Sequence, residues 1–359
     1  MTIATVAGST APGLRPLRDT EAAAGPAGGP PAGTAATAVR RVTVIGTGVI
    51  GTSVALGLRR AGVDVALADR DAASLAQAEL MGAGTVLGPE TPPADVVVIA
   101  TPPSTVPAVL RDAQRRGLGA AYTDVASTKA GIVAAARRAG CDLATYVPGH
   151  PMAGREISGP AAGRAGLFEG RPWALCPAGA SPAAVALVTG LVLLCGGVPR
   201  AVAAAEHDRM VAAVSHAPHV VAAALAARFA EDGADALVLA GQGLRDTTRI
   251  AAGPPELWSD ILRQNAGPVA AVLEAVAADL AAAAAALRAA EARTPGPRPA
   301  AEAGRTGASA PGAGHPAAVL AGLLSRGNLG RARIATPADP DTAPVPAAPA
   351  QAWVGRRAA

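Results

Sequence analysis

Apolar runs and amphipathic stretches alternate along the first part of the chain, from about residue 40 to residue 203. The apolar runs have the length and β-branched composition of buried parallel strands, and the stretches between them have helical spacing. Predicted strands lie at 42–45, 63–68, 95–100, 121–125, 172–176 and 198–203, and predicted helices at 49–60, 72–80, 105–115, 129–138 and 182–194. This alternation is typical of a doubly wound α/β sheet, which we predict for residues 39–203.

The pattern changes after about Ala204, where strand signals stop and only helical spacing remains. Stretches rich in Ala and Leu at 211–230, 234–240 and 256–292 predict an all-helical domain over residues 204–294. Because alanine faces bury little apolar area, we expect a second copy of the chain to complete the core. The sequence therefore predicts a helical dimerisation domain and a homodimer.

Both ends of the chain lack this periodicity. Residues 1–38 and 295–359 are rich in Ala, Gly and Pro, so we predict disordered tails with one short helix at 319–324. The formal net charge is +4. From Thr294 onward seven arginines face three acidic residues, so the excess charge lies in the C-terminal tail and the rest of the chain is near neutral.

Composition excludes several classes of partner. Aromatic residues make up only 2% of the chain, so platforms for stacking bases are nearly absent and we expect no nucleic-acid partner. Cys141, Cys176 and Cys195 show no C-x-x-C spacing and are typical of reduced thiols in a cytoplasmic protein. We find no signal-peptide pattern and no run of 18 apolar residues free of Gly, Pro and charge, so we expect no membrane contact.

A glycine-rich turn follows the first predicted strand. Gly46, Gly48 and Gly51 have the spacing G-x-G-x-x-G directly after the apolar run 42–45. Gly46 permits the tight turn, Gly48 lets a pyrophosphate approach the backbone, and Gly51 lets the following helix pack closely on the strand. The turn predicts a dinucleotide site.

The residues after this turn strengthen the prediction. The first helical turn, with Val49 and Ile50, offers unpaired N–H groups to phosphates. Asp69 ends the next strand about 20 residues beyond the glycines, where a carboxylate would accept hydrogen bonds from the adenosine ribose. A carboxylate repels a 2′-phosphate, so we predict NAD rather than NADP as the cofactor, although the neighbouring Arg70 weakens that preference. The whole pattern predicts a Rossmann-like domain.

Two later strand ends carry further candidates. Thr101 and Pro102 follow the third strand and should border the nicotinamide ribose, unless they merely end the strand. Ser127 and Lys129 follow the next strand and are expected to face the cofactor together. The alternative is that Ser127 only caps the helix at 129–138.

A histidine and two arginines have side chains suited to acid–base chemistry and to anion binding. His150 lies between Gly149 and Pro151 in a polar loop, and its ordinary pKa suits a general base near neutrality. Arg245 and Arg249 could clamp a carboxylate bidentately, or could instead pair with a nearby acid.

The helical domain contains three more histidines and an internal proline. Pro218 removes a backbone hydrogen bond and should bend its helix. His207, His216 and His219 could form a zinc site with a carboxylate. Because no second cluster supplies ligands, we predict no metal.

Several of these motifs occur together in one family. The chain resembles the prephenate/arogenate dehydrogenase (TyrA) family over about residues 40–294. The shared motifs, in order, are GTGVIGTS, DVASTK, GHPMAGREISG, SHAPH, GLRDTTRIA and PELWSD. The resemblance implies a Rossmann-like domain followed by a helical dimerisation domain. It also implies an NAD(P)-dependent oxidative decarboxylation of a cyclohexadienol, prephenate, to 4-hydroxyphenylpyruvate for tyrosine synthesis.

The resemblance also assigns roles to individual residues. His150 would accept the proton of the substrate hydroxyl, and Ser127 would support His150 and the nicotinamide side. Arg155 stands where small polar residues are common in the family, and its charge would favour the dianionic prephenate over arogenate. The residues expected around the substrate are Ser215, His219, Arg249, Arg245, Glu156, Arg155 and Trp258, with Trp258 reaching a partner subunit's site.

Three alternatives stay open at this point. The substrate could be arogenate or an amino-substituted prephenate, with the same chemistry. The chain could be a non-catalytic NAD(H) sensor, which would bind the cofactor without turnover. It could also be another Rossmann-plus-helical dehydrogenase acting on small hydroxy acids, although the SHAPH and GLRDTTRIA motifs speak against this.

Overall fold

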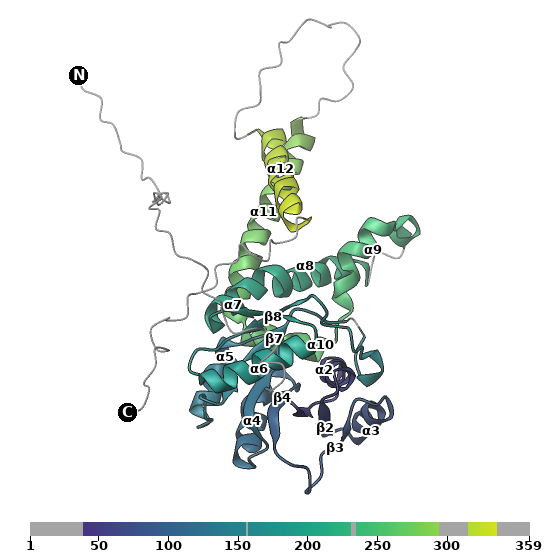
Figure 1. The fold of residues 1–359 in the computed structure, drawn as a ribbon. Coiled ribbons are helices and arrows are strands. Elements are labelled where there is room, and N and C mark those ends of the chain that lie inside the picture. The colour runs from purple at the N-terminus through teal and green to yellow at the C-terminus, as the bar shows by residue number, and fades with distance from the viewer. Residues whose placement is uncertain (1–38, 156, 231–234, 294–314, 336–359) are drawn as a thin grey trace, which may run out of the picture.

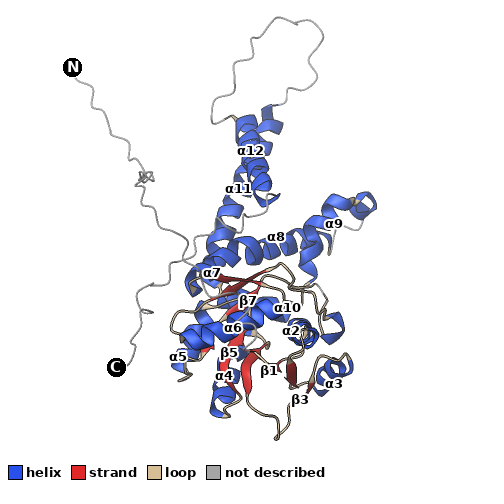
Figure 2. Cartoon of the chain, viewed as in Figure 1, coloured by secondary structure: helices blue, strands red, loops and turns tan. Residues whose placement is uncertain are grey.

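The computed structural model describes residues 39–155, 157–230, 235–293 and 315–335. Its centre is a parallel sheet with the strand order β3-β2-β1-β4-β5-β6 (Figures 1 and 2). The strands are β1 (Arg41–Ile45), β2 (Asp64–Ala68), β3 (Thr85–Val86), β4 (Ala94–Ile99), β5 (Gly119–Asp124) and β6 (Tyr146–Val147). The chain order reverses between β1 and β4, and this switch point is where open α/β sheets bind ligands. The predicted Rossmann-like fold class is confirmed.

Helices cover both faces of this sheet. They are α2 (Val49–Arg60), α3 (Ala72–Leu80), α4 (Val106–Arg115), α5 (Ala130–Arg138) and α6 (Pro182–Leu194). Val96 and Val98 of β4 enter one core together with Leu58 of α2, whereas Val97 and Ile99 enter the other core with α4 and α5. Side chains alternate along a strand, so a continuous apolar run is what a strand buried on both faces requires.

The two later predicted strands do not extend the main sheet. They are β8 (Pro172–Leu175) and β9 (Val198–Ala201), which form a separate three-stranded sheet with β7 (Gly149–Pro151) in the order β7-β8-β9. β7 is antiparallel to β8, and β8 is parallel to β9. The loop that carries His150 is therefore itself a strand, fixed by pairing with Ala174.

The second half of the described chain is helical, as expected. Its helices are α7 (Ala204–Val211), α8 (Ala217–Ala226), α9 (Gln242–Thr248), α10 (Pro255–Gln264) and α11 (Ala266–Arg293). The predicted helix at 211–230 is interrupted by a π-helical turn, η3 (Ala212–His216), just before Pro218. Proline cannot donate a backbone hydrogen bond, so the preceding turn widens there. The predicted helix at 234–240 is only a 3₁₀ turn, η5 (Asp235–Leu239).

A further helix, α12 (Pro316–Ala335), packs against α11, and the two extend away from the sheet (Figure 1). Arg326 pairs with Asp279 across this contact at 2.8 Å. The predicted helix at 319–324 was too short because Gly327 and Gly330 lower helix propensity, a local effect that packing on α11 overrides. The predicted disordered tails otherwise lie outside the described residues.

Length and composition would allow two helices to span a membrane. These are Ala204–Phe229 and Ala266–Ala292, with mean hydropathies of 1.6 and 1.8. Both helices contain charged residues, which is why the sequence pattern predicts no membrane span, whereas their mean hydropathy alone would allow one. The first of these helices carries His207 and Asp208, both buried within the described fold. The absence of membrane contact stays a prediction.

Candidate active site

The glycine turn between β1 and α2 is shaped so that only glycine fits two of its positions. Gly46 has φ +104°, and a Cβ atom there would lie 2.5 Å from the carbonyl oxygen of Ala100. A Cβ atom on Gly51 would lie 1.9 Å from the carbonyl oxygen of Gly46. Because real atoms cannot approach so closely, both positions keep the turn tight against the end of β4.

The third glycine of the turn has open space beside it. A Cβ atom on Gly48 would meet nothing within 4 Å. Gly48 is the N-cap residue of α2, and no side chain caps the helix there. The first-turn N–H groups, which include those of Val49 and Ile50, have no partners within the helix and suit a phosphate. The turn therefore fits the pyrophosphate of a dinucleotide.

Asp69 lies at the end of β2, beside the same turn. Its carboxylate accepts hydrogen bonds from the backbone N–H of Thr47 at 2.5 Å, the Thr47 hydroxyl at 2.8 Å and the backbone N–H of Asp71 at 2.9 Å. Arg70 is exposed. The acid is thus tied to the glycine turn, which is the position predicted for a ribose-binding carboxylate.

Thr101 and Pro102 follow β4 at the switch point. The Thr105 hydroxyl donates to the carbonyl oxygen of Pro102 at 2.7 Å, and the Thr101 hydroxyl lies 2.9 Å from the Thr105 hydroxyl. Since a Cβ atom on Gly46 would clash with Ala100, this strand end and the glycine turn are in direct contact. Both residues therefore lie at the predicted edge of the sheet.

Lys129 has a different role from the one predicted for it. Its side chain is fully buried, pairs with Asp124, and donates to the carbonyl oxygen of Gly149 at 2.5 Å. A side chain with no accessible surface cannot face a cofactor, so the prediction of cofactor contact is corrected to a structural role. The ammonium joins the end of β5 to the strand that carries His150.

Asp124 is the centre of this buried network, which the sequence motifs did not predict. The Tyr146 hydroxyl donates to its second oxygen at 2.5 Å. Burial, followed by the charge of Asp124, raises the pKa of Tyr146 well above its ordinary value. Tyr146 therefore stays a hydrogen-bond donor. The DVASTK motif contained both members of the ion pair, but nothing in the spacing pointed to Tyr146.

Ser127 is half-buried after β5 and does not cap α5. The cap comes instead from the distant Asp208, whose carboxylate accepts the backbone N–H groups of Lys129 and Ala130 at 2.8 Å each. The alternative interpretation of Ser127 as a helix cap is therefore wrong. Its own role in the site stays a prediction.

His150 is half-buried on β7, at the carboxyl end of β5. Its Nδ1 atom lies 2.9 Å from Nε2 of His207, and the two rings meet edge to face with centroids 5.1 Å apart. His207 in turn places Nδ1 at 2.8 Å from Oδ1 of Asp208. Burial, followed by the charges of His207 and Lys129, lowers the pKa of His150 well below its ordinary value. At neutral pH the imidazole is therefore uncharged and able to accept a proton.

Two further histidines complete the cluster. His216 is fully buried, and its Nδ1 atom lies 3.1 Å from Nδ2 of Asn265. Burial lowers the pKa of His216 to about 4. His219 stacks on the indole of Trp258 with ring centroids 3.5 Å apart. The buried Nε2 of His216 and Nδ1 of His219 have no hydrogen-bond partner within the described structure.

Two family models match the chain, and together they cover most of its described length. "Prephenate dehydrogenase, nucleotide-binding domain" matches residues 54–200, and "Prephenate dehydrogenase, dimerization domain" matches residues 203–294. The chain belongs to the prephenate dehydrogenase family. The predicted family and its activity class, an NAD(P)-dependent dehydrogenase that decarboxylates its substrate, are both confirmed. The first match begins after the glycine turn, so the case for that turn depends on its own geometry.

Individual relatives agree with this family. The chain is 41% identical over 247 residues to "Probable prephenate dehydrogenase NovF" of Streptomyces niveus, covering 68% of this chain and 67% of that protein. It is 31% identical to the prephenate dehydrogenase of Bacillus subtilis, covering 62% of this chain and 64% of that one. The chain thus spans about two thirds of the length of these relatives.

Solved structures of the family share the fold. Prephenate dehydrogenase of Aquifex aeolicus in complex with hydroxyphenyl propionate and NAD⁺ has a TM-score of 0.64 at 24% identity, covering 82% of this chain and 98% of that one. Arogenate dehydrogenase of Synechocystis has a TM-score of 0.60 at 24% identity, covering 82% and 99%. At these identities the likeness establishes the arrangement of both halves.

The remaining family positions lie in or near the helical half. Ser215 is half-buried in the π-helical turn, between the two helices that carry His207 and His219. Arg249 is exposed at the start of η6 (Arg249–Ala252), which packs against α8. Arg155 is half-buried and donates to the carbonyl oxygen of Ala162 at 3.2 Å. Glu156 lies outside the described residues.

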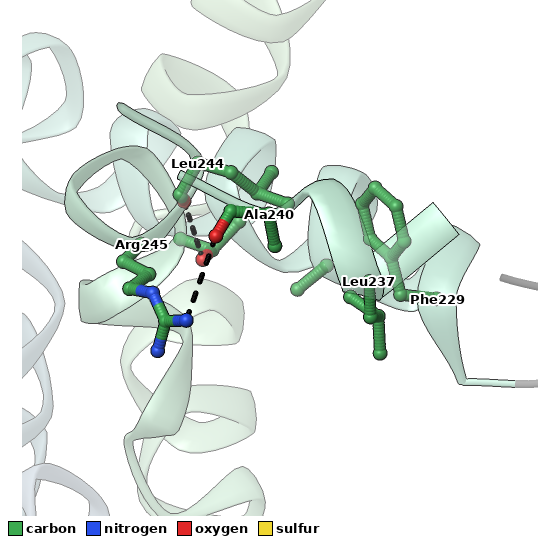
Figure 3. A pocket seen from close by; sticks show the side chains of 7 residues that line it. Phe229, Leu237, Ala240, Leu244 and Arg245 are labelled. Carbon is green, nitrogen blue, oxygen red and sulfur yellow. Dashed lines mark hydrogen bonds between the residues drawn. The ribbon is translucent and has the colours of Figure 1, made fainter. Parts of the chain in front are cut away.

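Arg245 lies in a different pocket. This pocket, of about 330 Å³, is lined by Ala226, Phe229, Leu237, Ala240, Leu244, Arg245 and Thr248. Figure 3 shows the guanidinium of Arg245 directed at the carbonyl oxygen of Ala240, which lies 3.5 Å from it. None of the lining residues is a histidine of the cluster, and the substrate contact of Arg245 that the family resemblance implies stays a prediction.

The three helical histidines also bear on the zinc alternative. His207 uses Nδ1 for Asp208 and Nε2 for His150, so neither nitrogen is left to bind a metal. Within the described ranges, no group of three or more His, Cys, Asp or Glu side chains could hold a metal ion. The geometry assigns His207 to a hydrogen-bond chain instead.

Proposed function

We propose that this member of the family catalyses the NAD-dependent oxidative decarboxylation of prephenate to 4-hydroxyphenylpyruvate, a step of tyrosine synthesis. The observation that carries the proposal is the uncharged His150, held by backbone pairing at the carboxyl edge of a sheet whose glycine turn fits a dinucleotide. A proton acceptor and a dinucleotide site at one sheet edge are what an alcohol oxidation needs.

His150 acts as the general base. NAD, when held by the glycine turn, would supply the acceptor for the hydride that leaves the substrate carbon bearing the hydroxyl group. His150 accepts the proton of that hydroxyl, so the oxygen can form a carbonyl as the hydride leaves. The bond to the ring carboxylate then breaks, CO₂ leaves, and the bond's electron pair makes the ring aromatic as a phenolate. His150 returns its proton to the phenolate oxygen, which gives the phenol and regenerates the base. Ser127, half-buried beside the end of β5, supports His150 on the nicotinamide side.

The helical half holds the substrate. His219 is 6% exposed and fixed by its stack on Trp258, which suits a polar contact between its ring and the substrate. Ser215 lies one helical turn before it. Arg249 supplies the guanidinium for the side-chain carboxylate, while Arg155 adds positive charge near the His150 strand and favours the dianionic prephenate.

NAD is the proposed cofactor. The Asp69 carboxylate, tied by three hydrogen bonds beside the glycine turn, supports this choice because it would repel a 2′-phosphate. Gly46, Gly48, Val49, Ile50 and Gly51 hold the pyrophosphate. Arg70, Thr101 and Pro102 border the ribose groups.

The proposed assembly is a cytoplasmic homodimer. Leucines along the α11–α12 pair are exposed, among them Leu280 (60%), Leu287 (58%) and Leu324 (68%). A family match called a dimerization domain covers α11, which supports burial of this surface against a second copy. Analytical ultracentrifugation should give twice the mass of one chain. Buried free thiols, with the pKa of Cys176 and Cys195 raised to about 12 by burial, are consistent with a reducing compartment.

The test is NADH formation by the purified protein with prephenate and NAD, with 4-hydroxyphenylpyruvate measured as the product. Parallel assays use arogenate, an amino-substituted prephenate, and NADP. Turnover of arogenate or the amino compound at a higher kcat/KM than prephenate would reassign the substrate. Cofactor binding without turnover of any cyclohexadienol would make the chain a sensor.

A further inference from the structure

Behind His150 lies a chain of two polar side chains that the proposed reaction does not by itself require. Nδ1 of His150 lies 2.9 Å from Nε2 of His207, and Nδ1 of His207 lies 2.8 Å from Oδ1 of Asp208. His207 is 2% exposed and Asp208 is 4% exposed, so both are shielded from water. Buried polar groups in such a chain constrain one another's protonation.

The carboxylate fixes the direction of the hydrogen bonds. Asp208 accepts the backbone N–H groups of Lys129 and Ala130 as well as the ring of His207, so three donors point at it. An ionised carboxylate can only accept, so Nδ1 of His207 must carry the proton. In neutral His207 the other nitrogen, Nε2, is then bare and must accept a hydrogen bond from Nδ1 of His150.

The same hydrogen-bond directions determine which ring nitrogen of His150 carries the proton. With its proton on Nδ1, the Nε2 atom of its ring carries the free lone pair. No hydrogen bond to this Nε2 occurs within the described part of the chain, and the side chain is half-buried rather than enclosed. The other charged or titratable groups that face His150 are Lys129 and His216. Lys129 is occupied by Asp124 and Gly149, and His216 lies against Asn265.

We infer that Asp208 and His207 are positioning residues that lock His150 in the tautomer with a bare Nε2, ready to take the substrate proton. This inference deepens the proposed function, because it assumes that His150 is the general base. Once His150 has accepted the proton, its Nδ1–H remains bonded to His207, and the Asp208 carboxylate balances the new positive charge through that ring. In a serine protease triad, a carboxylate orients a histidine in a comparable way.

The first measurement needs no substrate. In protein with ¹⁵N-labelled histidine, NMR reports which ring nitrogen of each histidine carries a proton, and the His150→Asn variant assigns the His150 signals. The expected result is a proton on Nδ1 of both His150 and His207 at neutral pH. A proton on Nε2 of His150 in the wild-type protein would overturn the inference.

The second measurement reverses the direction of the hydrogen bonds that run from Asp208 through His207 to His150. In Asp208→Asn, an amide N–H directed at His207 would move the proton of His207 to Nε2, which would then donate to His150 and leave its outer nitrogen protonated. We expect the NMR tautomer of His150 to switch and kcat to fall roughly 100-fold or more, with KM little changed. An unchanged tautomer or an unchanged kcat would each contradict the inference.

Controls separate positioning from folding. Glu206→Gln removes a carboxylate from the same helix, where Glu206 pairs with Arg209 near the surface, and should leave tautomer and kcat as in the wild type. His207→Gln, whose side-chain oxygen can still accept from His150, should retain more kcat than His207→Leu. If Asp208→Asn does not fold, the comparison of His207→Gln with His207→Leu and the tautomer of the wild-type protein still test the inference. Wild-type protein with the expected tautomer but no turnover of any cyclohexadienol would refute the proposed function alone.

Discussion

The two halves of the candidate site are built in different ways. On the cofactor side, backbone geometry forms the site. It consists of a six-residue turn, two glycines that exclude any side chain, and a helix end without a side-chain cap. On the base side, buried side chains from separate segments are joined by hydrogen bonds. His150 and His207 lie 57 positions apart, and Lys129 and Asp208 lie 79 apart.

This difference predicts which kind of substitution should damage each half of the site. The glycine turn tolerates no added volume at Gly46 and Gly51, but it depends on no single charge. The histidine cluster depends on the protonation state of each member and on partners that donate or accept hydrogen bonds. Substitutions that change volume should therefore damage the first half most, and substitutions that change charge or proton position should damage the second.

The largest effect is expected on the base side. His150→Asn removes the proton acceptor but keeps a polar side chain of similar size, so kcat should fall by about 10²–10⁴ while KM changes little. Steady-state NADH formation from prephenate measures both constants. A variant with the wild-type kcat would remove His150 from the mechanism and shift attention to His219.

The matching test of the cofactor side compares two glycines. Gly51→Ala forces a Cβ atom to within 1.9 Å of the Gly46 carbonyl, so the free energy of unfolding should fall by about 1–3 kcal/mol or more. Gly48→Ala meets open space, so stability should change by less than about 1 kcal/mol. NAD affinity should nevertheless fall in Gly48→Ala, because the methyl group occupies the phosphate's approach.

Urea unfolding and calorimetric titration with NAD separate the two outcomes. Equal loss of stability in both variants would mean that the turn is tight throughout. Full NAD affinity in Gly48→Ala would mean that the pyrophosphate does not approach this side of the turn.

A third prediction distinguishes the two arginines. Arg249→Ala should raise KM for prephenate roughly 10- to 150-fold, because a charge-assisted hydrogen bond to the carboxylate contributes about 1.5–3 kcal/mol of binding free energy. Arg245→Ala serves as the matched control, since Arg245 lies in the separate pocket of Figure 3. Steady-state kinetics decide between them, and the reverse ranking would assign the carboxylate to Arg245.

The smallest effect concerns pH and stability. Burial lowers the pKa of His216 to about 4 from an ordinary value of 6.5. Between these pH values the unfolded chain binds a proton that the folded chain excludes, so stability is full above about pH 6.5 and falls as the pH drops toward 4. His216→Asn should flatten this dependence in urea unfolding. The variant His315→Gln, which changes an exposed histidine, should leave the pH dependence of stability unchanged. An equal effect of both variants would mean that burial of His216 does not cause this dependence.

The sequence predicted the cofactor half well because its determinants are local. Strand, glycines, helix and acid occupy residues 42–69, and their spacing alone predicts the turn that the structure contains. The family motifs likewise pointed to His150 and His219. Lys129 was misjudged because its burial depends on Asp124 and Gly149, which come from two other elements.

The base half was predicted only in part for the same physical reason. His207 and Asp208 stand in an ordinary helical stretch, and no spacing rule shows that this helix meets the start of α5. One signal was present: two adjacent polar residues, one of them an acid, on a helix face that the fold buries. That signal gains meaning only when the distance to His150 is known.

Asp208 holds two structures at once, since the same carboxylate that fixes His207 also caps α5 of the sheet domain. The helical half therefore cannot swing away from the sheet without releasing the ring behind the base. Opening of the molecule to admit substrate or discharge product would switch proton abstraction off, and closure would restore it. One carboxylate therefore links the packing of the two halves to the orientation of the ring behind His150.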